Sequence, residues 1–267
     1  MVVTVISQFF ARLVAEPAVL VTVQATRGSV PRETGTWMAV FASGFFGTIG
    51  GGHLEFQAMA HARQCLSDMP CASPVRYALG PTLGQCCGGE VQVQFEPVSA
   101  ADLDALQNRL QPVRTPLALF GGGHVGHALV DVLGNLPLRI TWVDSRDEIF
   151  PSHVPEHVVC EHSDPVQAAV RSLASGSRVL IMSFSHAEDL EVVANCLMRQ
   201  RLQADLPFVG LIGSQTKWAT FRHRLAARGF TPQELAHVTC PIGVPGIRGK
   251  APEVIAVAVA AQILQTL

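Results

Sequence analysis

The sequence is poor in charged and aromatic residues, and this excludes several classes of function. Of its 267 residues, 15% are charged and 6% are aromatic, the formal net charge is −2, and Lys and Arg form no run. A nucleic-acid-binding protein needs a cationic surface against phosphates, so we expect no nucleic acid partner. The hydrophobic content of 48% is typical of a globular chain and excludes general disorder.

The sequence also lacks a segment suited to secretion or to a membrane. The apolar N-terminal stretch is interrupted by Arg12, Glu16 and Pro17, and it has no basic leader followed by a small-residue cleavage site. The apolar run at residues 254–267 is too short to span a bilayer and contains Gln262. We therefore expect a soluble protein without membrane contact.

Cysteine occurs seven times, but without the spacing of a metal knuckle or of a disulfide-stabilised domain. The count is odd, no CxxC pair occurs, and five cysteines are scattered: Cys65, Cys71, Cys160, Cys196 and Cys240. We expect neither a disulfide framework nor a zinc knuckle, and this cysteine usage favours a reducing, cytoplasmic location.

The other two cysteines, Cys86 and Cys87, are adjacent and lie among glycines, in Gly84-Gln85-Cys86-Cys87-Gly88-Gly89. Glycines leave the sulfurs and the nearby amides open to a ligand, so we interpret this stretch as a binding site rather than as packing. The alternative is that two small, easily buried residues are neighbours in a glycine-rich turn.

Two regions of different style divide the chain. Residues 1–100 predict a smaller α+β domain, with strands at 19–26, 37–41, 45–49 and 91–95 and a helix at 54–66. Residues 101–115 predict a linker that includes a short helix-like stretch at 102–110, with Pro112 near its end and Pro116 directly after it. Residues 116–267 alternate short apolar strands with helices, including one expected at 165–173, which predicts a Rossmann-like, doubly wound parallel sheet. The fold class is therefore α/β.

The first strand–helix turn of the second region carries a dinucleotide-binding pattern. Gly121, Gly123 and Gly126 fit G-x-G-x-x-G, and the next strand ends in Asp144, 23 residues after Gly121. Such glycines admit a pyrophosphate at a helix N-terminus, and the carboxylate can accept hydrogen bonds from ribose hydroxyls. The alternative is a tight turn that binds nothing.

Other loops add candidate binding residues. His186 and Ser214 follow later strands of the same region, where open α/β sheets bind ligands, although Ser214 is also a natural helix cap. In the first region, Gly50, Gly51 and Gly52 precede a helix and predict a second anion site, which Arg32 would complement. The alternative there is an exposed turn with solvated arginines.

Several of these motifs, in this order, resemble the XdhC/CoxI family. The likeness runs from about residue 19 to the C-terminus and rests on residues 28–32, 47–52, 85–89 and 121–126, and on the closing segments 241–243 and 250–253. Cys87 matches the cysteine of the family's Cys-Gly-Gly motif, and Cys86 corresponds to an extra thiol seen in one branch.

The resemblance implies a chaperone for the molybdenum cofactor (molybdopterin). Such a protein binds the cofactor, supports its sulfuration with a cysteine desulfurase and delivers it to apo xanthine dehydrogenase, with no turnover reaction of its own required. A thiolate is a suitable ligand for soft, sulfur-bound molybdenum. The residues also leave open an oxidoreductase that binds NAD(P) or another nucleotide, and a sulfurtransferase with a persulfide on Cys87. The apolar C-terminal helix is compatible with either the core or a homodimer contact.

Overall fold

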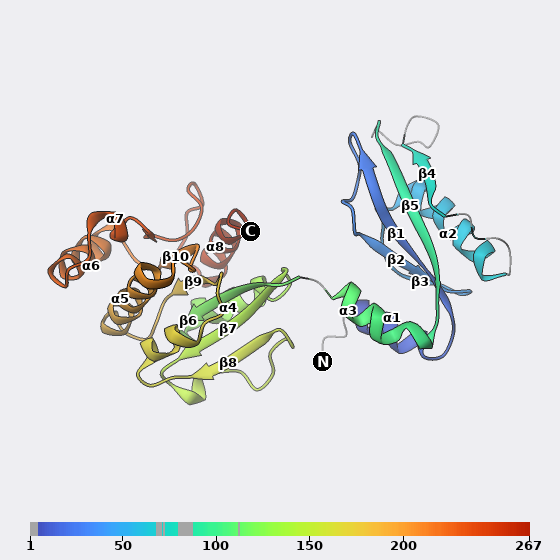
Figure 1. Cartoon of the computed structure of the whole chain (residues 1–267). Coiled ribbons are helices and arrows are strands. Elements are labelled where there is room, and N and C mark those ends of the chain that lie inside the picture. Colours follow the sequence, from blue (N-terminus) through green and yellow to red (C-terminus); the bar gives the residue numbers. More distant parts are fainter. Residues whose placement is uncertain (1–4, 68–70, 72, 80–87, 112) are drawn as a thin grey trace. The chain divides into compact units, whose positions relative to one another are not determined.

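The chain forms two compact units, Met1–Gln111 and Pro112–Leu267, each with its own sheet. The computed structural model describes residues 5–67, 71, 73–79, 88–111 and 113–267 (Figure 1). Each unit is described separately below.

The first unit is a five-stranded antiparallel sheet in the order β3-β2-β1-β5-β4. Its central strand β1 pairs with β2 and β5. The strands are β1 (Ala18–Arg27), β2 (Trp37–Val40), β3 (Phe45–Gly47), β4 (Val75–Ala78) and β5 (Glu90–Val98). Alternate residues of β1 point to opposite faces, and both faces are covered, which is why this strand reads as almost continuously apolar.

Helices cover both faces of this sheet (Figure 1). The helix α2 (Gly52–Leu66) packs on the face of Val19 and Val21, while α1 (Val5–Leu13) and α3 (Leu103–Leu110) pack on the face of Leu20. The stretch predicted as linker, 101–115, is thus partly helical, and Leu106 of α3 lies in the core. We had predicted neither α1 nor β4.

The second unit is a six-stranded parallel sheet in the order β11-β10-β9-β6-β7-β8. The strands are β6 (Thr115–Phe120), β7 (Leu138–Asp144), β8 (Val158–His162), β9 (Arg178–Ile181), β10 (Phe208–Leu211) and β11 (Val238–Thr239). Counted within the unit and read from β8, this is the strand order 3-2-1-4-5-6 of the Rossmann fold. The predicted fold class is confirmed, and the order reverses between β6 and β9.

Helices lie on both faces of the parallel sheet as well. The helices α4 (His124–Leu133) and α8 (Pro252–Leu264) cover one face, and the other face is covered by η4 (Val166–Ser172), α5 (His186–Gln203), α6 (Gln215–Ala227) and α7 (Pro232–Leu235). The α-helix expected at 165–173 is instead the 3-10 helix η4. Its buried Val166 and Ala169 are three residues apart, as suits three residues per turn.

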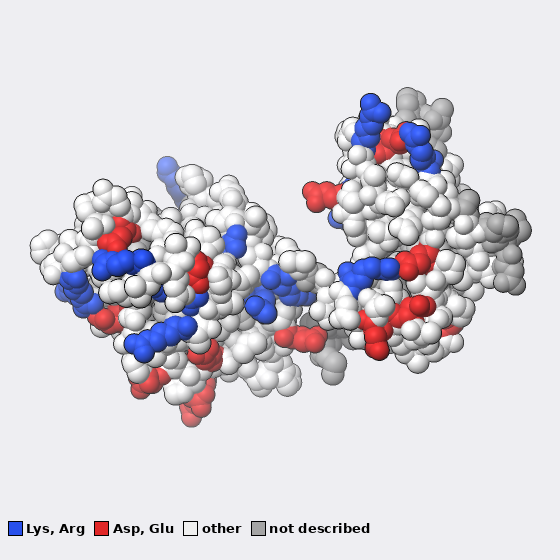
Figure 2. Space-filling model, viewed as in Figure 1, with Lys and Arg blue, Asp and Glu red and all other residues white. Residues whose placement is uncertain are grey.

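The charged residues of the described surface form no field of one sign. On the face shown in Figure 2, Lys and Arg lie among Asp and Glu over both units. Several of them form ion pairs, such as Arg76 with Glu90 and Arg109 with Glu96. No helix of the described ranges has the length and apolar character needed to cross a membrane.

Candidate functional site

The turn between β6 and α4 lies at the point where the strand order reverses. Gly121 has a φ of +123°, and a Cβ there would collide with the carbonyl group of Met182, which follows β9. A Cβ at Gly126 would collide with the carbonyl oxygen of Gly121, and Trp142 Nε1 donates to that same oxygen at 2.9 Å. Packing therefore requires both glycines whether or not a ligand binds.

Gly123, which precedes α4, faces open space. A Cβ at Gly123 would have no atom within 4 Å, and no side chain caps this helix. By contrast, α5, α6 and α7 are capped by Ser185, Ser214 and Thr231. The N-terminal amides of α4 thus retain donor capacity at the positive end of the helix dipole. This arrangement suits an anion such as a phosphate.

Asp144 is buried at the end of β7 and is held by its own neighbours. Its Oδ2 accepts from the Gly122 amide at 2.6 Å and from Arg146 Nη2 at 3.0 Å. Its Oδ1 accepts from the Arg146 amide and from Arg146 Nε, both at 2.9 Å. Asp144 is 1% exposed. The carboxylate that we predicted to bind ribose is therefore already paired with the Arg146 guanidinium. Its bond to the Gly122 amide also joins the glycine turn to the end of β7.

These contacts set the ionisation of Asp144. Burial raises the pKa of its carboxyl, but hydrogen bonds from the Arg146 side chain and from the Gly122 and Arg146 amides outweigh burial, so the pKa lies below its usual range. Asp144 is consequently charged at neutral pH. The same pairing raises the pKa of the Arg146 guanidinium.

Arg146 also forms part of an exposed platform. Its guanidinium carbon lies 4.4 Å from the ring centroid of Phe184, and that ring is 66% exposed. Close by, Ser145 Oγ donates to Glu188 Oε1 at 2.8 Å. An exposed aromatic ring with a cation against it can stack a planar heterocycle at this edge of the sheet.

Two buried oxygen atoms beside this platform have no hydrogen-bond partner among the described residues. They are Ser183 Oγ and Glu188 Oε2. Buried polar atoms are nearly always paired, and an unpaired one costs about 1–3 kcal/mol. The hydrogen-bonding capacity of these two atoms is therefore unused among the described residues, and sequence reasoning missed both.

Asp189 and Lys217 form a buried ion pair behind the same loops. Asp189 accepts from Lys217 Nζ at 2.6 Å and from the Ser183 amide at 2.7 Å, and Lys217 also donates to the Ile212 carbonyl at 2.8 Å. Both side chains are almost fully buried. The pair fixes the loop after β9 to the loop after β10, which positions Ser183.

The two other residues predicted in these loops have different surroundings. Ser214 Oγ accepts from the Lys217 amide at 3.1 Å, so this hydroxyl caps α6. His186 is exposed at the first residue of α5, with its ring edge-on to Phe221 at 6.4 Å between centroids. Among the described contacts, neither residue is bonded to Asp144 or Arg146.

The glycine turn of the first unit is filled by a carboxylate from its own helix. Glu55 Oε2 accepts from Thr48 Oγ1 at 2.6 Å, from the Ile49 amide at 3.1 Å and from the Gly51 amide at 3.0 Å. A phosphate at Gly50–Gly52 would have to displace this carboxylate. Arg32 is exposed and lies beside Gly50. The turn of the second unit is the more open of the two.

Cys86 and Cys87 lie outside the described residues, but the glycines after them do not. A Cβ at Gly89 would collide with the backbone of Ser29, and the Gly89 carbonyl accepts from the Leu79 amide at 2.7 Å. Close packing of two backbone segments thus accounts for Gly89. The roles proposed for the two thiols stay predictions.

One pair of the scattered cysteines corrects the sequence analysis. Cys65 and Cys71 are joined by a disulfide, although no disulfide was expected from their spacing. The six-residue separation carries no recognisable pattern in the sequence. Cys160, Cys196 and Cys240 are free.

Each of the two units matches a family model of known proteins. Residues 117–263 match the family model described as the XdhC Rossmann domain, and residues 12–77 match that of the XdhC and CoxI family. An uncharacterised Escherichia coli K12 protein, YqeB, is 25% identical over 253 residues, which are 93% of this chain and 43% of YqeB. The chain thus spans less than half the length of that relative.

A solved structure shows the same fold over nearly the whole chain. It is a crystal structure from Bacillus halodurans described as a xanthine dehydrogenase, with a TM-score of 0.77 at 20% identity, covering 97% of this chain and 94% of that one. The Rossmann-domain model matches residues 117–263, which are more than half of the 267 residues. This protein therefore belongs to the XdhC and CoxI family, as its sequence motifs predicted.

Proposed function

We propose that this protein is an accessory chaperone that binds the molybdenum cofactor, supports its sulfuration and delivers it to apo xanthine dehydrogenase. Membership of the XdhC and CoxI family supports an accessory role toward that enzyme. The proposal places the protein in a reducing cytoplasm, with a cysteine desulfurase as the source of sulfur. Cys86 and Cys87 then serve as thiolates that ligate molybdenum or carry sulfur.

The observation that carries this proposal is the uncapped N-terminus of α4 beside two buried, unpartnered oxygens. The amides of the turn at Gly123 suit the phosphate of the pterin cofactor. Ser183 Oγ can donate to a phosphate oxygen, and Glu188 Oε2 can accept from an N–H or O–H of the bound group. The exposed Phe184 ring suits the flat face of a heterocycle.

The first experiment measures pterin retained by the purified full chain. The protein is made in hosts with and without cofactor synthesis, and bound pterin is released, oxidised and quantified by fluorescence. We expect pterin only from the competent host. Replacement of Cys86 and Cys87 by Ser should reduce retention, whereas Cys160→Ser, at a free cysteine of the second unit, should not. Equal retention by the double Ser variant would contradict the role of the two thiols.

A second variant tests the phosphate site. Gly123→Asp places a carboxylate at the N-cap of α4, in open space and at an ordinary φ of −75°. Asp is a favourable N-cap, so the variant should be as stable as the parent or about 1 kcal/mol more stable. The negative charge should lower pterin retention at least about tenfold, or ~1.4 kcal/mol. Unchanged pterin retention would show that the phosphate does not bind at the N-terminus of α4.

Asp144 and Arg146 favour one alternative, a pyridine-dinucleotide-dependent oxidoreductase. In this fold an arginine near the strand-end carboxylate accommodates the 2′-phosphate of NADP, and Arg146 is at that place. The alternative predicts saturable binding that is tighter for NADPH than for NADH, with this preference lost in Arg146→Gln. It also predicts turnover of small carbonyl compounds. Binding of NADPH without turnover would contradict the oxidoreductase alternative and would mean that the chaperone also binds a nucleotide.

A further inference from the structure

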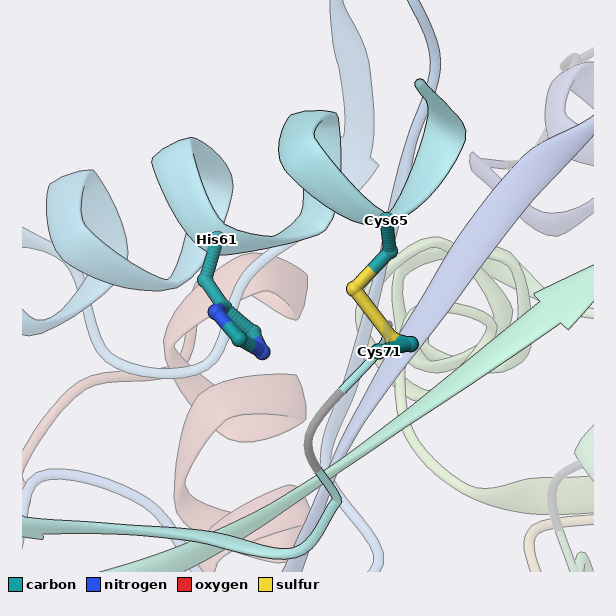
Figure 3. Close-up of side chains that lie close together, drawn as sticks. All are labelled: His61, Cys65 and Cys71. Carbon is teal, nitrogen blue, oxygen red and sulfur yellow. A yellow bond between two sulfur atoms is a disulfide. The ribbon is translucent and has the colours of Figure 1, made fainter. Parts of the chain in front are cut away.

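A second group of sulfur and nitrogen side chains lies in the first unit, separate from Cys86 and Cys87 in sequence. His61 and Cys65 lie one turn apart on α2, and Cys71 follows that helix. The ligand atoms of these three residues all lie within 4.8 Å of one another, and all three residues are half-buried. Figure 3 shows the side chains of His61 and Cys65 projecting from the same side of α2, with Cys71, on the chain beyond the helix, bonded to Cys65.

We propose that His61, Cys65 and Cys71 form a binding site for Zn²⁺ when the Cys65–Cys71 disulfide is reduced. Two thiolates and one imidazole are a typical zinc ligand set, and residues at i and i+4 of a helix present their ligands on one face. Zn–S bonds of about 2.3 Å and Zn–N bonds of about 2.0 Å place tetrahedral ligands ~3.5–3.8 Å apart. Ligand atoms already within 4.8 Å reach this spacing by side-chain rotation once the two sulfurs are no longer bonded.

The surroundings hold the ligands in place and leave room for a fourth. The His61 ring packs edge-on against Phe95, with 4.5 Å between centroids, which restricts its orientation. Cys65 and Cys71 pack against the apolar cluster between α2 and the sheet. A cavity of about 360 Å³ adjoins Cys65 and is also lined by Leu66 and Pro97. Three protein ligands with access from a cavity leave one coordination position for water or an exchangeable ligand.

Oxidation state and metal binding exclude each other at this site. A dithiol reduces the Cys65–Cys71 disulfide by two electrons, giving two protein thiols and the oxidised, disulfide form of the reductant. Zn²⁺ then displaces one proton from each thiol, and no electrons are transferred. Exchange with a small-molecule disulfide re-forms the protein disulfide: two electrons pass from the thiolates to that molecule, which takes up two protons to become two thiols, and the ion is released. The pair thus acts as a disulfide under oxidising conditions and as a zinc ligand under reducing ones.

The test uses the full chain in which Cys86 and Cys87 are both replaced by Ser, because two adjacent thiols would compete for metal. A phosphine reduces the disulfide, with water supplying the oxygen of the phosphine oxide, and the excess is removed without air. Co²⁺ is then titrated as a spectroscopic probe for Zn²⁺. We expect one equivalent bound, with thiolate-to-cobalt charge transfer and the visible bands of tetrahedral cobalt. Zn²⁺ should displace the cobalt, and the oxidised chain should give no such spectrum.

His61→Phe separates a metal site from a purely structural disulfide. It keeps a ring against Phe95 and leaves both cysteines in place, so the oxidised variant should retain the disulfide. Its cobalt affinity should fall at least about tenfold. The matched control is His223→Phe, at an exposed helical histidine of the second unit, and it should bind as the parent does. Cys65→Ser should abolish the charge-transfer band, whereas Cys160→Ser should keep it.

Two results would overturn the proposal. One is a reduced parent chain that takes up no cobalt. The other is a His61→Phe variant that binds cobalt with the parent's affinity and spectrum. Neither result depends on pterin or on Cys86 and Cys87. A negative cobalt titration therefore does not contradict the proposed chaperone function, and a negative pterin assay does not contradict the zinc site.

Discussion

At the scale of single residues, Asp144 shows how a carboxylate predicted for a ligand is held by contacts within the protein. It joins the glycine turn to Arg146 through hydrogen bonds on both oxygens, so the cation lies at the point where a nucleotide would bind. The carboxylate cannot accept two ribose hydroxyls without giving up part of this pairing. Arg146 is therefore the residue most suited to discriminate among ligands with and without an extra phosphate.

Asp144→Asn should destabilise the protein by about 1–3 kcal/mol, because it removes a charged acceptor from several hydrogen bonds. The folded pKa of Asp144 lies below the ordinary 3.8, so its ionised form adds stability that is fully present above about pH 3.8 and is lost as pH falls through the folded pKa. Urea unfolding at pH 7 and at lower pH checks both points. The difference from the parent should shrink in acid. The exposed Asp147→Asn is the control and should change stability by less than about 0.5 kcal/mol.

The free cysteines should differ in reactivity. Burial raises the pKa of the Cys196 thiol to about 12, which outweighs the opposing effect of Arg199. Burial also raises the pKa values of Cys160 and Cys240, but these residues are only half-buried. Alkylation of the native chain at pH 8, read by mass spectrometry, should label Cys160 and Cys240 before Cys196. Labelling of Cys196 at the same rate as Cys160 would show that its pocket opens readily.

At the scale of elements, helix caps decide which residues are open to a ligand. Ser214→Ala removes the α6 cap and should cost about 1 kcal/mol, whereas Ser214→Asp keeps a capping oxygen and should restore stability. Because Ser214 already accepts from the Lys217 amide, pterin retention should be the same in both variants. Thermal unfolding and the pterin assay together check this. Lower pterin retention by Ser214→Ala than by the parent would indicate that Ser214 takes part in pterin binding.

Most elements of both sheets follow from the sequence, because strand and helix periodicities are local properties. The run from β6 to α6 alternates so regularly that the parallel, doubly wound sheet could be predicted. The short strand β4 could not be predicted. Its four residues alternate between half-buried and exposed, with none fully buried, and its pairing partner, β5, comes later in the chain. The helix α1 was not predicted either, because its nine residues make fewer than three turns, which is a short window in which to establish a helical period.

At the scale of the whole molecule, the motifs could be located from the sequence, but their internal contacts could not. The glycine turns and Asp144 were predicted from spacing, whereas Glu55 filling the first turn and Arg146 holding Asp144 depend on side-chain placement. The pair Asp189–Lys217 joins residues 28 positions apart on different loops, and no periodicity encodes it. A carboxylate four residues after Gly51, and an arginine two residues after Asp144, are the only local signals of these contacts.

The two units should open independently, because each has apolar clusters of its own among the described residues. Leu119→Ala, at a fully buried residue of β6, should cost about 2–5 kcal/mol, as should Leu20→Ala in β1. Amide hydrogen exchange read by mass spectrometry should then speed up at least about 30-fold in the slowest amides of the mutated unit only. Acceleration in both units by either variant would show that they unfold as one.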